Sequence, residues 1–197
     1  MIIKPNTNLL PQEGEVLFFP DFFNFEDSNR LFKSLTDNIE WKQEQIKGWG
    51  KVNPVPRLTA WYGDSGKTYK YSGISHTPNP WTKELLEIKN KIEKIAKVKF
   101  SSVLLNLYRD GKDSVWWHSD DEKELGTNPV IGSVSFGASR TFKFQHKEDK
   151  SLKTQVDLTH GSFVLMQGET QHKWNHAILK TKKVLLPRIN LTFRVIR

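Results

Sequence analysis

The stretch 188-RINLTFR-194 determines much of how this chain folds. Apolar and polar residues alternate in it, and the polar ones are Arg188, Asn190, Thr192 and Arg194. Because residues two apart in a strand share a face, this strand has one apolar face and one face with two guanidinium groups. A guanidinium binds a carboxylate or phosphate through two parallel hydrogen bonds. The strand therefore predicts a site for an anionic group, with a solvated edge strand as the alternative.

Four other stretches after residue 100 have the same period of two. They are 101-SSVLLNLYRD-110, 129-PVIGSVSFG-137, 140-RTFKFQH-146 and 161-GSFVLMQG-168. Glycine or polar turns separate them, and no helical pattern lies between them. Strands without crossover helices favour an antiparallel sandwich or jelly roll. In the first stretch, Asn106 and Tyr108 share the face of Leu104 and offer hydrogen bonds toward a ligand, or else lie on the surface.

The N-terminal half predicts two helices. One is indicated by Leu31, Leu35 and Ile39, which recur every four residues. The other covers 81–98, with an apolar stripe at steps of three and four and Thr82 as its N-cap. Residues 46–80 are rich in Gly, Pro, Tyr and Trp and indicate turns and short strands. We expect a mainly β, α+β chain with flanking helices.

Composition limits the chemistry. The 197 residues suggest one domain, and 30 Lys and Arg against 22 Asp and Glu give a net charge of +8, which favours a polyanionic partner. There is no Cys, so a metal must be held by His, Asp or Glu. The N-terminus does not resemble a signal peptide, and no apolar run is long enough for a membrane span. We expect an intracellular protein, cytoplasmic or nuclear, that is not secreted and has no membrane partner.

One cluster has the spacing of a metal site. His118 and Asp120 are two residues apart, so both side chains can reach one ion from an extended segment. A lone H-x-D is common by chance, and a third ligand is needed. His172 and His176 are both candidates for it. Two imidazoles and one carboxylate suit a non-haem Fe(II) with open coordination positions, which a 2-oxo acid and dioxygen can occupy.

The ordered pattern N-x-Y, H-x-D, a later His and R-x-N-x-T-x-R resembles the AlkB family of Fe(II)- and 2-oxoglutarate-dependent dioxygenases. The resemblance runs from about residue 46 to the C-terminus and includes PRLTAWYGD, WWHSDDE, SVSFGASRTF and PRINLTFR. It is closest to the homologues that repair alkylated DNA. It implies a double-stranded β-helix over about 100–197, and an N-terminal extension over about 1–99 that carries helices and a nucleotide-recognition lid. Together these form one domain.

The resemblance also implies residue roles. The catalytic iron ligands are His118, Asp120 and His176, since the family spacing selects His176 over His172. The 2-oxoglutarate ligands are Asn106, Tyr108, Arg188, Asn190 and Arg194. Arg188 is expected at the distal carboxylate and against Asp120, and Thr192 is expected to be structural. The substrate contacts are Trp49, Arg57, Tyr69, Tyr71, Asp121 and Glu122, with Trp61 and Trp117 as further candidates or core residues.

The resemblance predicts an oxidative demethylase for 1-methyladenine and 3-methylcytosine in single- or double-stranded DNA. The cofactor is Fe(II), with 2-oxoglutarate and O2 as co-substrates, and the chain is expected to act as a monomer. Trp49 lies where a duplex-specific relative inserts an aromatic wedge, and a loop Trp folded onto the core is the alternative. Other possibilities are an RNA or nucleotide demethylase, a catalytically silent nucleic-acid-binding module, and a protein or lipid oxidase.

Overall fold

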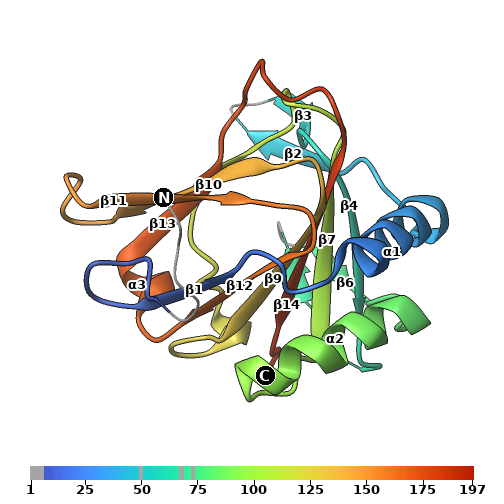
Figure 1. The fold of residues 1–197 in the computed structure, drawn as a ribbon, viewed down its shortest axis with the longest axis horizontal. Helices are drawn as coiled ribbons and strands as arrows, with labels where there is room; N and C mark the ends of the chain where they lie inside the picture. Colours follow the sequence, from blue (N-terminus) through green and yellow to red (C-terminus); the bar gives the residue numbers. More distant parts are fainter. Residues whose placement is uncertain (1–6, 49–50, 67–68, 72–73) are drawn as a thin grey trace.

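In the computed structural model, which describes residues 7–48, 51–66, 69–71 and 74–197, two antiparallel sheets face each other (Figure 1). The larger sheet has the order β1 (Glu15–Phe19), β12 (Ser162–Gln167), β9 (Ile131–Gly137), β14 (Arg188–Arg194), β7 (Ser102–Tyr108) and β4 (Leu58–Gly63). The smaller has the order β11 (Lys153–Leu158), β10 (Arg140–His146), β13 (Trp174–Ile178) and β8 (Val115–His118). The mainly β, antiparallel jelly-roll prediction is confirmed.

The two predicted helices cover the outer face of the larger sheet (Figure 1). They are α1 (Phe25–Asn38) and α2 (Lys83–Ala96). Thr82 caps α2 as predicted, since its side chain accepts a hydrogen bond from the Leu85 amide. None of the helices in the described ranges is long and apolar enough to cross a membrane.

The central strand β14 separates two environments. Its register places Arg188 opposite Tyr108 of β7, and Asn190 opposite both Asn106 and Ser135 of its two neighbours. The apolar residues of β14 lie in the core beneath the helices. The polar residues of the same strand line the space between the two sheets. The alternation predicted for residues 188–194 is therefore present in the structure, with the apolar residues facing the core and the polar residues facing the cavity.

Several strands lay outside the sequence prediction. β8 lacks an apolar run because its Trp and His residues line the cavity. In β13 the buried Trp174 is followed by Asn175 and the cavity-lining His176, which interrupts the apolar pattern. β11 is an edge strand with an exposed face. β1 and β4 form both edges of the larger sheet, so the N-terminal half contributes to the β core and not only to an extension of it.

Shorter elements complete the chain. Two hairpins occupy the region where turns and short strands were expected: β2 (Gln45–Gly48) with β3 (Lys51–Pro54), and β5 (Tyr69–Tyr71) with β6 (Ile74–His76). A 3-10 turn, η1 (Lys123–Leu125), follows β8. A short helix, α3 (Thr170–Lys173), leads directly into β13.

The attachment of α2 can be measured with a matched pair of substitutions. Ile88 is fully buried against the sheet, whereas Ile95 on the same helix is 39% exposed. Ile88→Ala should lower the free energy of unfolding by about 2–5 kcal/mol, because it leaves a cavity in the core. Ile95→Ala should change it by about 1 kcal/mol or less. Urea unfolding tests this, and equal losses in the two variants would contradict the packing described here.

Candidate active site

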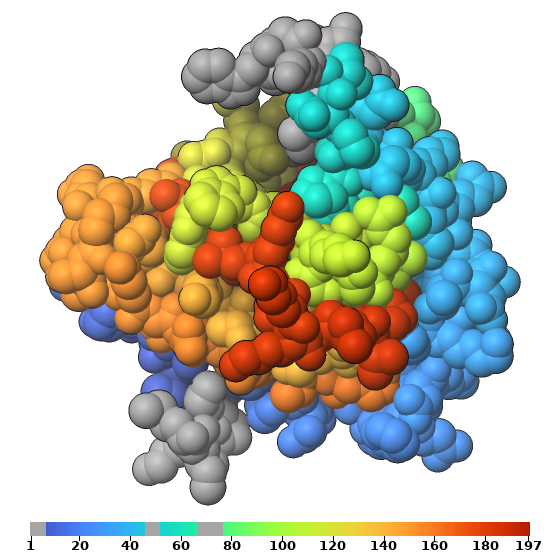
Figure 2. All heavy atoms as spheres, turned by 90° about the horizontal axis from the view of Figure 1, so that it is seen from above, coloured from blue at the N-terminus to red at the C-terminus, as the bar shows by residue number. Residues whose placement is uncertain are grey.

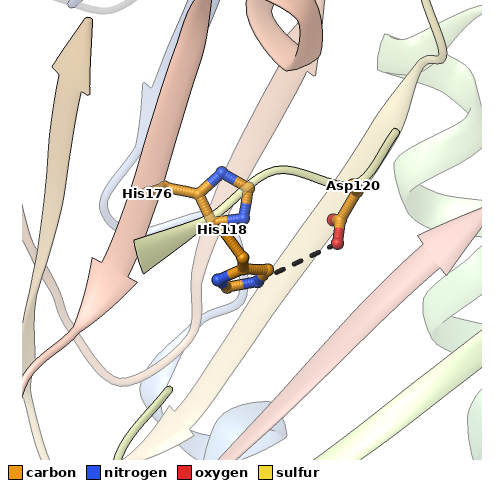
Figure 3. A group of neighbouring side chains, drawn as sticks. All are labelled: His118, Asp120 and His176. Atoms are coloured by element: carbon orange, nitrogen blue, oxygen red, sulfur yellow. Dashed lines mark ion pairs between the residues drawn. The ribbon is translucent and has the colours of Figure 1, made fainter. Parts of the chain in front are cut away.

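Three metal-ligating side chains meet between the sheets (Figure 3). β8 ends at His118, the following loop carries Asp120, and β13 carries His176 directly opposite His118 in the β8–β13 pairing. One ligand atom from each residue lies within 4.8 Å of the others. His172 is exposed on α3, where its Nε2 accepts a hydrogen bond from the Asn128 amide at 3.2 Å. The structure therefore groups His176, and not His172, with the H-x-D pair.

Both histidine rings are suited to bind a metal. Nδ1 of His118 lies 2.7 Å from the carbonyl oxygen of Trp116, to which it donates, and Nε2 lies 4.0 Å from Oδ1 of Asp120. Burial, together with the neighbouring His118, lowers the pKa of His176 to about 3. His176 is therefore neutral near pH 7, and in the described part of the chain its buried Nδ1 has no hydrogen-bond partner. A neutral imidazole is the form that coordinates a metal.

The carboxylate of Asp120 is held in its charged form. Burial alone would raise the pKa of Asp120, but the positive charge of Arg194 and the nearby histidines outweigh burial and lower it. Nη2 of Arg194 donates to Oδ1 of Asp120 at 2.7 Å. Arg188 was expected against Asp120, and that expectation is wrong. Arg188 lies six residues, and so three inward-facing positions, away along β14.

A cavity of about 570 Å³ extends from these ligands into the space between the sheets. Figure 2 shows the face on which residues of β3, in cyan, lie near yellow-green residues of the segment leading into β8. The segment after β3 contributes Val55, Pro56 and Arg57 to the cavity lining. The polar face of β14 lines the same cavity.

The inner end of the cavity is built for an anion. Arg188 is 1% exposed, and its Nη2 donates to Ser135 Oγ at 2.9 Å. Within the described ranges its Nε and Nη1 are buried without a hydrogen-bond partner, and no carboxylate there forms an ion pair with it. Burial lowers the pKa of Arg188 to about 10, so the group is a cation at pH 7. A buried cation with unused donors is costly unless an anion fills the space.

Tyr108 lies beside a second cation. The Cζ atoms of Arg188 and Arg140 lie 5.1 and 5.6 Å from the centre of its ring. Arg140 donates to the carbonyl oxygens of Asp110, Asp113 and Leu179, so its role is to hold these loops. Both charges add to the positive potential at the inner end of the cavity.

Two asparagines that line the cavity differ in how many of their side-chain hydrogen-bonding groups are already used. Asn106 Oδ1 accepts from Nε of Arg57 at 2.7 Å, so its amide NH2 is the group that it can offer to a ligand. Asn190 donates to Ser133 Oγ and to the Val134 carbonyl, and its Oδ1 accepts from Thr192. Arg57 was expected to contact substrate; the structure places it on Asn106 and on the Ser114 carbonyl.

The remaining predicted substrate residues separate into groups. Glu122 lines the cavity, as do Trp61 and Trp117. Asp121 is not among the lining residues; its carboxylate is 52% exposed and lies 3.4 Å from Nζ of Lys147. Trp49 lies outside the described residues, as do the side chains of Tyr69 and Tyr71.

The sequence analysis did not predict the residues that surround Arg188 and Asn190 at the inner end of the cavity. Ser133 and Ser135 on β9 hydrogen-bond Asn190 and Arg188, and Arg140 lies near Tyr108. The alternation of serine with apolar residues in 131-IGSVSFG-137 could have placed the serines on the polar side. The role of Arg140 could not be found from pattern, because its partners are backbone carbonyls.

The jelly roll brings together two histidines, one aspartate and a buried arginine with donors that no described residue uses. These are the features of a mononuclear metal site of the non-haem iron type, with a place for an acidic co-substrate. A family model described as the 2OG-Fe(II) oxygenase superfamily matches residues 15–194. The chain belongs to this superfamily, whose members use Fe(II), 2-oxoglutarate and O2.

Named relatives place it within the AlkB group. It is 42% identical to the alpha-ketoglutarate-dependent dioxygenase alkB homolog 3 of Mus musculus, over 93% of this chain and 66% of that protein. It is 36% identical to the DNA oxidative demethylase ALKBH2 of Homo sapiens, over 98% of this chain and 77% of that protein. The chain thus spans just under two thirds of the length of the alkB homolog 3 relative. The predicted AlkB resemblance is confirmed.

A solved structure supports the fold. The structure of OsALKBH1 matches with a TM-score of 0.64 and 15% identity, over 98% of this chain and all of that one.

The choice between the two candidate histidines can be tested by substitution. His176→Ala should abolish 2-oxoglutarate-dependent succinate release and Mn(II) binding, because it removes one of three ligands. His172→Ala, as the control, should keep both, because His172 is exposed on α3 and lies outside the group of three ligands. Loss of metal binding in the His172 variant, with binding retained in the His176 variant, would overturn the assignment.

The contact between Arg57 and Asn106 leads to a second test. Arg57→Met should weaken 2-oxoglutarate binding about tenfold, or about 1.4 kcal/mol, because the Asn106 amide loses the partner that orients it. Calorimetry with Mn(II) in place of Fe(II) and no oxygen measures this. Arg30→Met, which removes an exposed ion pair between α1 and α2, is the control. Unchanged affinity in the Arg57 variant would exclude the orienting role.

Proposed function

We propose that this chain is an oxidative demethylase that repairs N-alkylated bases in DNA, with 1-methyladenine and 3-methylcytosine as its substrates. The observation that carries the proposal is the His118, Asp120 and His176 group, of which Asp120 and His176 are buried, at one cavity with Arg188. Two nitrogens of Arg188 have no hydrogen-bond partner among the described residues. The relatives named ALKBH2 are called DNA oxidative demethylases, which supports DNA as the substrate. The net charge of +8 suits a polyanionic substrate.

The proposed overall reaction is balanced in atoms. 2-Oxoglutarate, O2 and the N-methyl group give succinate, CO2 and an N-hydroxymethyl group, which then breaks down to formaldehyde and the unmodified base. When bound, iron together with its co-substrates supplies the oxidation. His118, Asp120 and His176 would hold the metal. Arg188 would bind the distal carboxylate of 2-oxoglutarate, and the Asn106 amide would donate a hydrogen bond to the co-substrate.

The cavity walls would select the base and exclude water. A base methylated at a ring nitrogen carries a positive charge, which aromatic faces and a carboxylate attract. Trp61, Trp117 and Glu122 line the cavity and supply such groups. Phe142, Leu158 and Met166 add apolar surface between the sheets. Keeping water out strengthens each electrostatic contact in the site.

The segments before β7 would form the nucleotide-recognition lid. The β2–β3 and β5–β6 hairpins precede the catalytic strands, and the segment after β3 reaches the cavity. In this proposal Trp49 is the wedge that fills the gap of a flipped base, and Tyr69 and Tyr71 contact the base. Asp121, beside Lys147, would act from the rim of the site. The chain would work as a single intracellular domain and as a monomer.

The proposal is tested by mass spectrometry of oligonucleotides that carry 1-methyladenine or 3-methylcytosine. They would be incubated with the protein, Fe(II), 2-oxoglutarate and O2, as single strands and as duplexes. We expect loss of the methyl group only when 2-oxoglutarate is present, and none with the His176→Ala variant. Methyl loss from RNA alone would replace DNA with RNA as the substrate. If the protein neither removes the methyl group nor releases succinate, the result would contradict an enzymatic role.

A further inference from the structure

A buried side chain that is not one of the three proposed metal ligands contacts the loop after β8, which carries Asp120. Gln171, the second residue of α3, is fully buried. Its Oε1 accepts a hydrogen bond from the backbone amide of Asp120 at 2.9 Å, although the two residues are 51 positions apart. Its Nε2 lies 3.6 Å from Sδ of Met166. Of these two contacts of the Gln171 side chain, the shorter is therefore with Asp120, the residue that would supply the carboxylate ligand.

Lys147 joins the same loop to α3 at a second point. Nζ of Lys147 donates to the carbonyl oxygen of Gln171 at 2.9 Å and lies 3.4 Å from Oδ2 of Asp121. The loop is therefore joined to α3 directly at Asp120 and, through Lys147, at Asp121.

α3 is itself fixed to the larger sheet. Oγ1 of Thr170, which is fully buried, accepts from the Glu15 amide at 2.9 Å and donates to the Gln167 carbonyl at 2.6 Å. Gly14 has φ of +131°, and a Cβ there would approach Thr170 atoms to 2.7–2.9 Å, so the β1 segment packs closely on α3. Since β13 starts at the next residue after α3, Gln171 also lies on the segment that leads to His176.

We infer that Gln171 is a positioning residue for the metal site, an assignment that rests on the metal-binding part of the proposed function. Asp120 is held from two sides: Gln171 fixes its backbone amide, and Arg194 fixes its carboxylate. A ligand that is already in place loses less freedom when the ion binds, so these contacts raise metal affinity. A neutral amide suits this place, because a carboxylate would repel the charge of Asp120.

Metal affinity measured apart from turnover tests this role. Mn(II), as a stand-in for Fe(II), would be titrated into each variant without oxygen and followed by electron paramagnetic resonance. Gln171→Met keeps the side-chain length but removes the acceptor, and it should weaken Mn(II) binding about tenfold or more. His172→Ala, on the same short helix, should bind Mn(II) like the unaltered protein. Ile88→Ala controls for lost stability, and it should bind Mn(II) normally where it is folded.

The outcomes separate the two proposals. Mn(II) affinity of Gln171→Met equal to that of the unaltered protein would overturn the positioning role. If that variant does not fold, Gln171→Asn withdraws the acceptor by one methylene, and unchanged affinity there overturns the role as well. If the unaltered protein binds Mn(II) but removes no methyl group, only the substrate proposal fails. If the unaltered protein binds no Mn(II), the metal site and the role of Gln171 fail together.

Discussion

The ion pair between Arg194 and Asp120 is the interaction on which the site depends. It joins the last residue of the central strand to the loop that follows β8, and so links the larger sheet to the smaller one. Because Asp120 is buried, its charge would be unfavourable without this partner. The same contact directs the carboxylate toward His118 and His176. Fold and metal site are therefore established together by one polar strand face.

The polar face of β14 assigns its two arginines to different tasks. Arg194 is neutralised by Asp120, whereas Nε and Nη1 of Arg188 are buried with no hydrogen-bond partner among the described residues. A dianionic co-substrate bound there, as proposed, would offset the energetic cost of that arrangement. Serines of β9 and the Arg57–Asn106 contact fix the orientation of the groups around it. We therefore expect the unused donors of Arg188 to make the cavity selective for an acid.

Much of the fold and of the candidate site could be predicted from the sequence, because β14 and the helices α1 and α2 have regular periodic patterns of apolar residues. The structure has the predicted alternation in β14. Ile189, Leu191 and Phe193 lie in the core, and their polar neighbours line the cavity. Strand β8 was not predicted because its Trp and His residues line the cavity in place of an apolar run. Strand β13 was not predicted because Asn175 and the cavity-lining His176 interrupt its apolar residues. Contacts such as Arg194 with Asp120 and Gln171 with Asp120 join residues 74 and 51 positions apart, so no local pattern reports them.

We propose that one cavity holds the metal at His118, Asp120 and His176 and the far carboxylate of 2-oxoglutarate at Arg188. A crystal structure of the protein with Mn(II) and 2-oxoglutarate, grown without oxygen, tests it most directly. The account predicts metal density between these three side chains and the distal carboxylate on the free donors of Arg188, with Arg194 still paired to Asp120. A metal bound through His172, or a distal carboxylate on Arg194 with Arg188 unused, would contradict it.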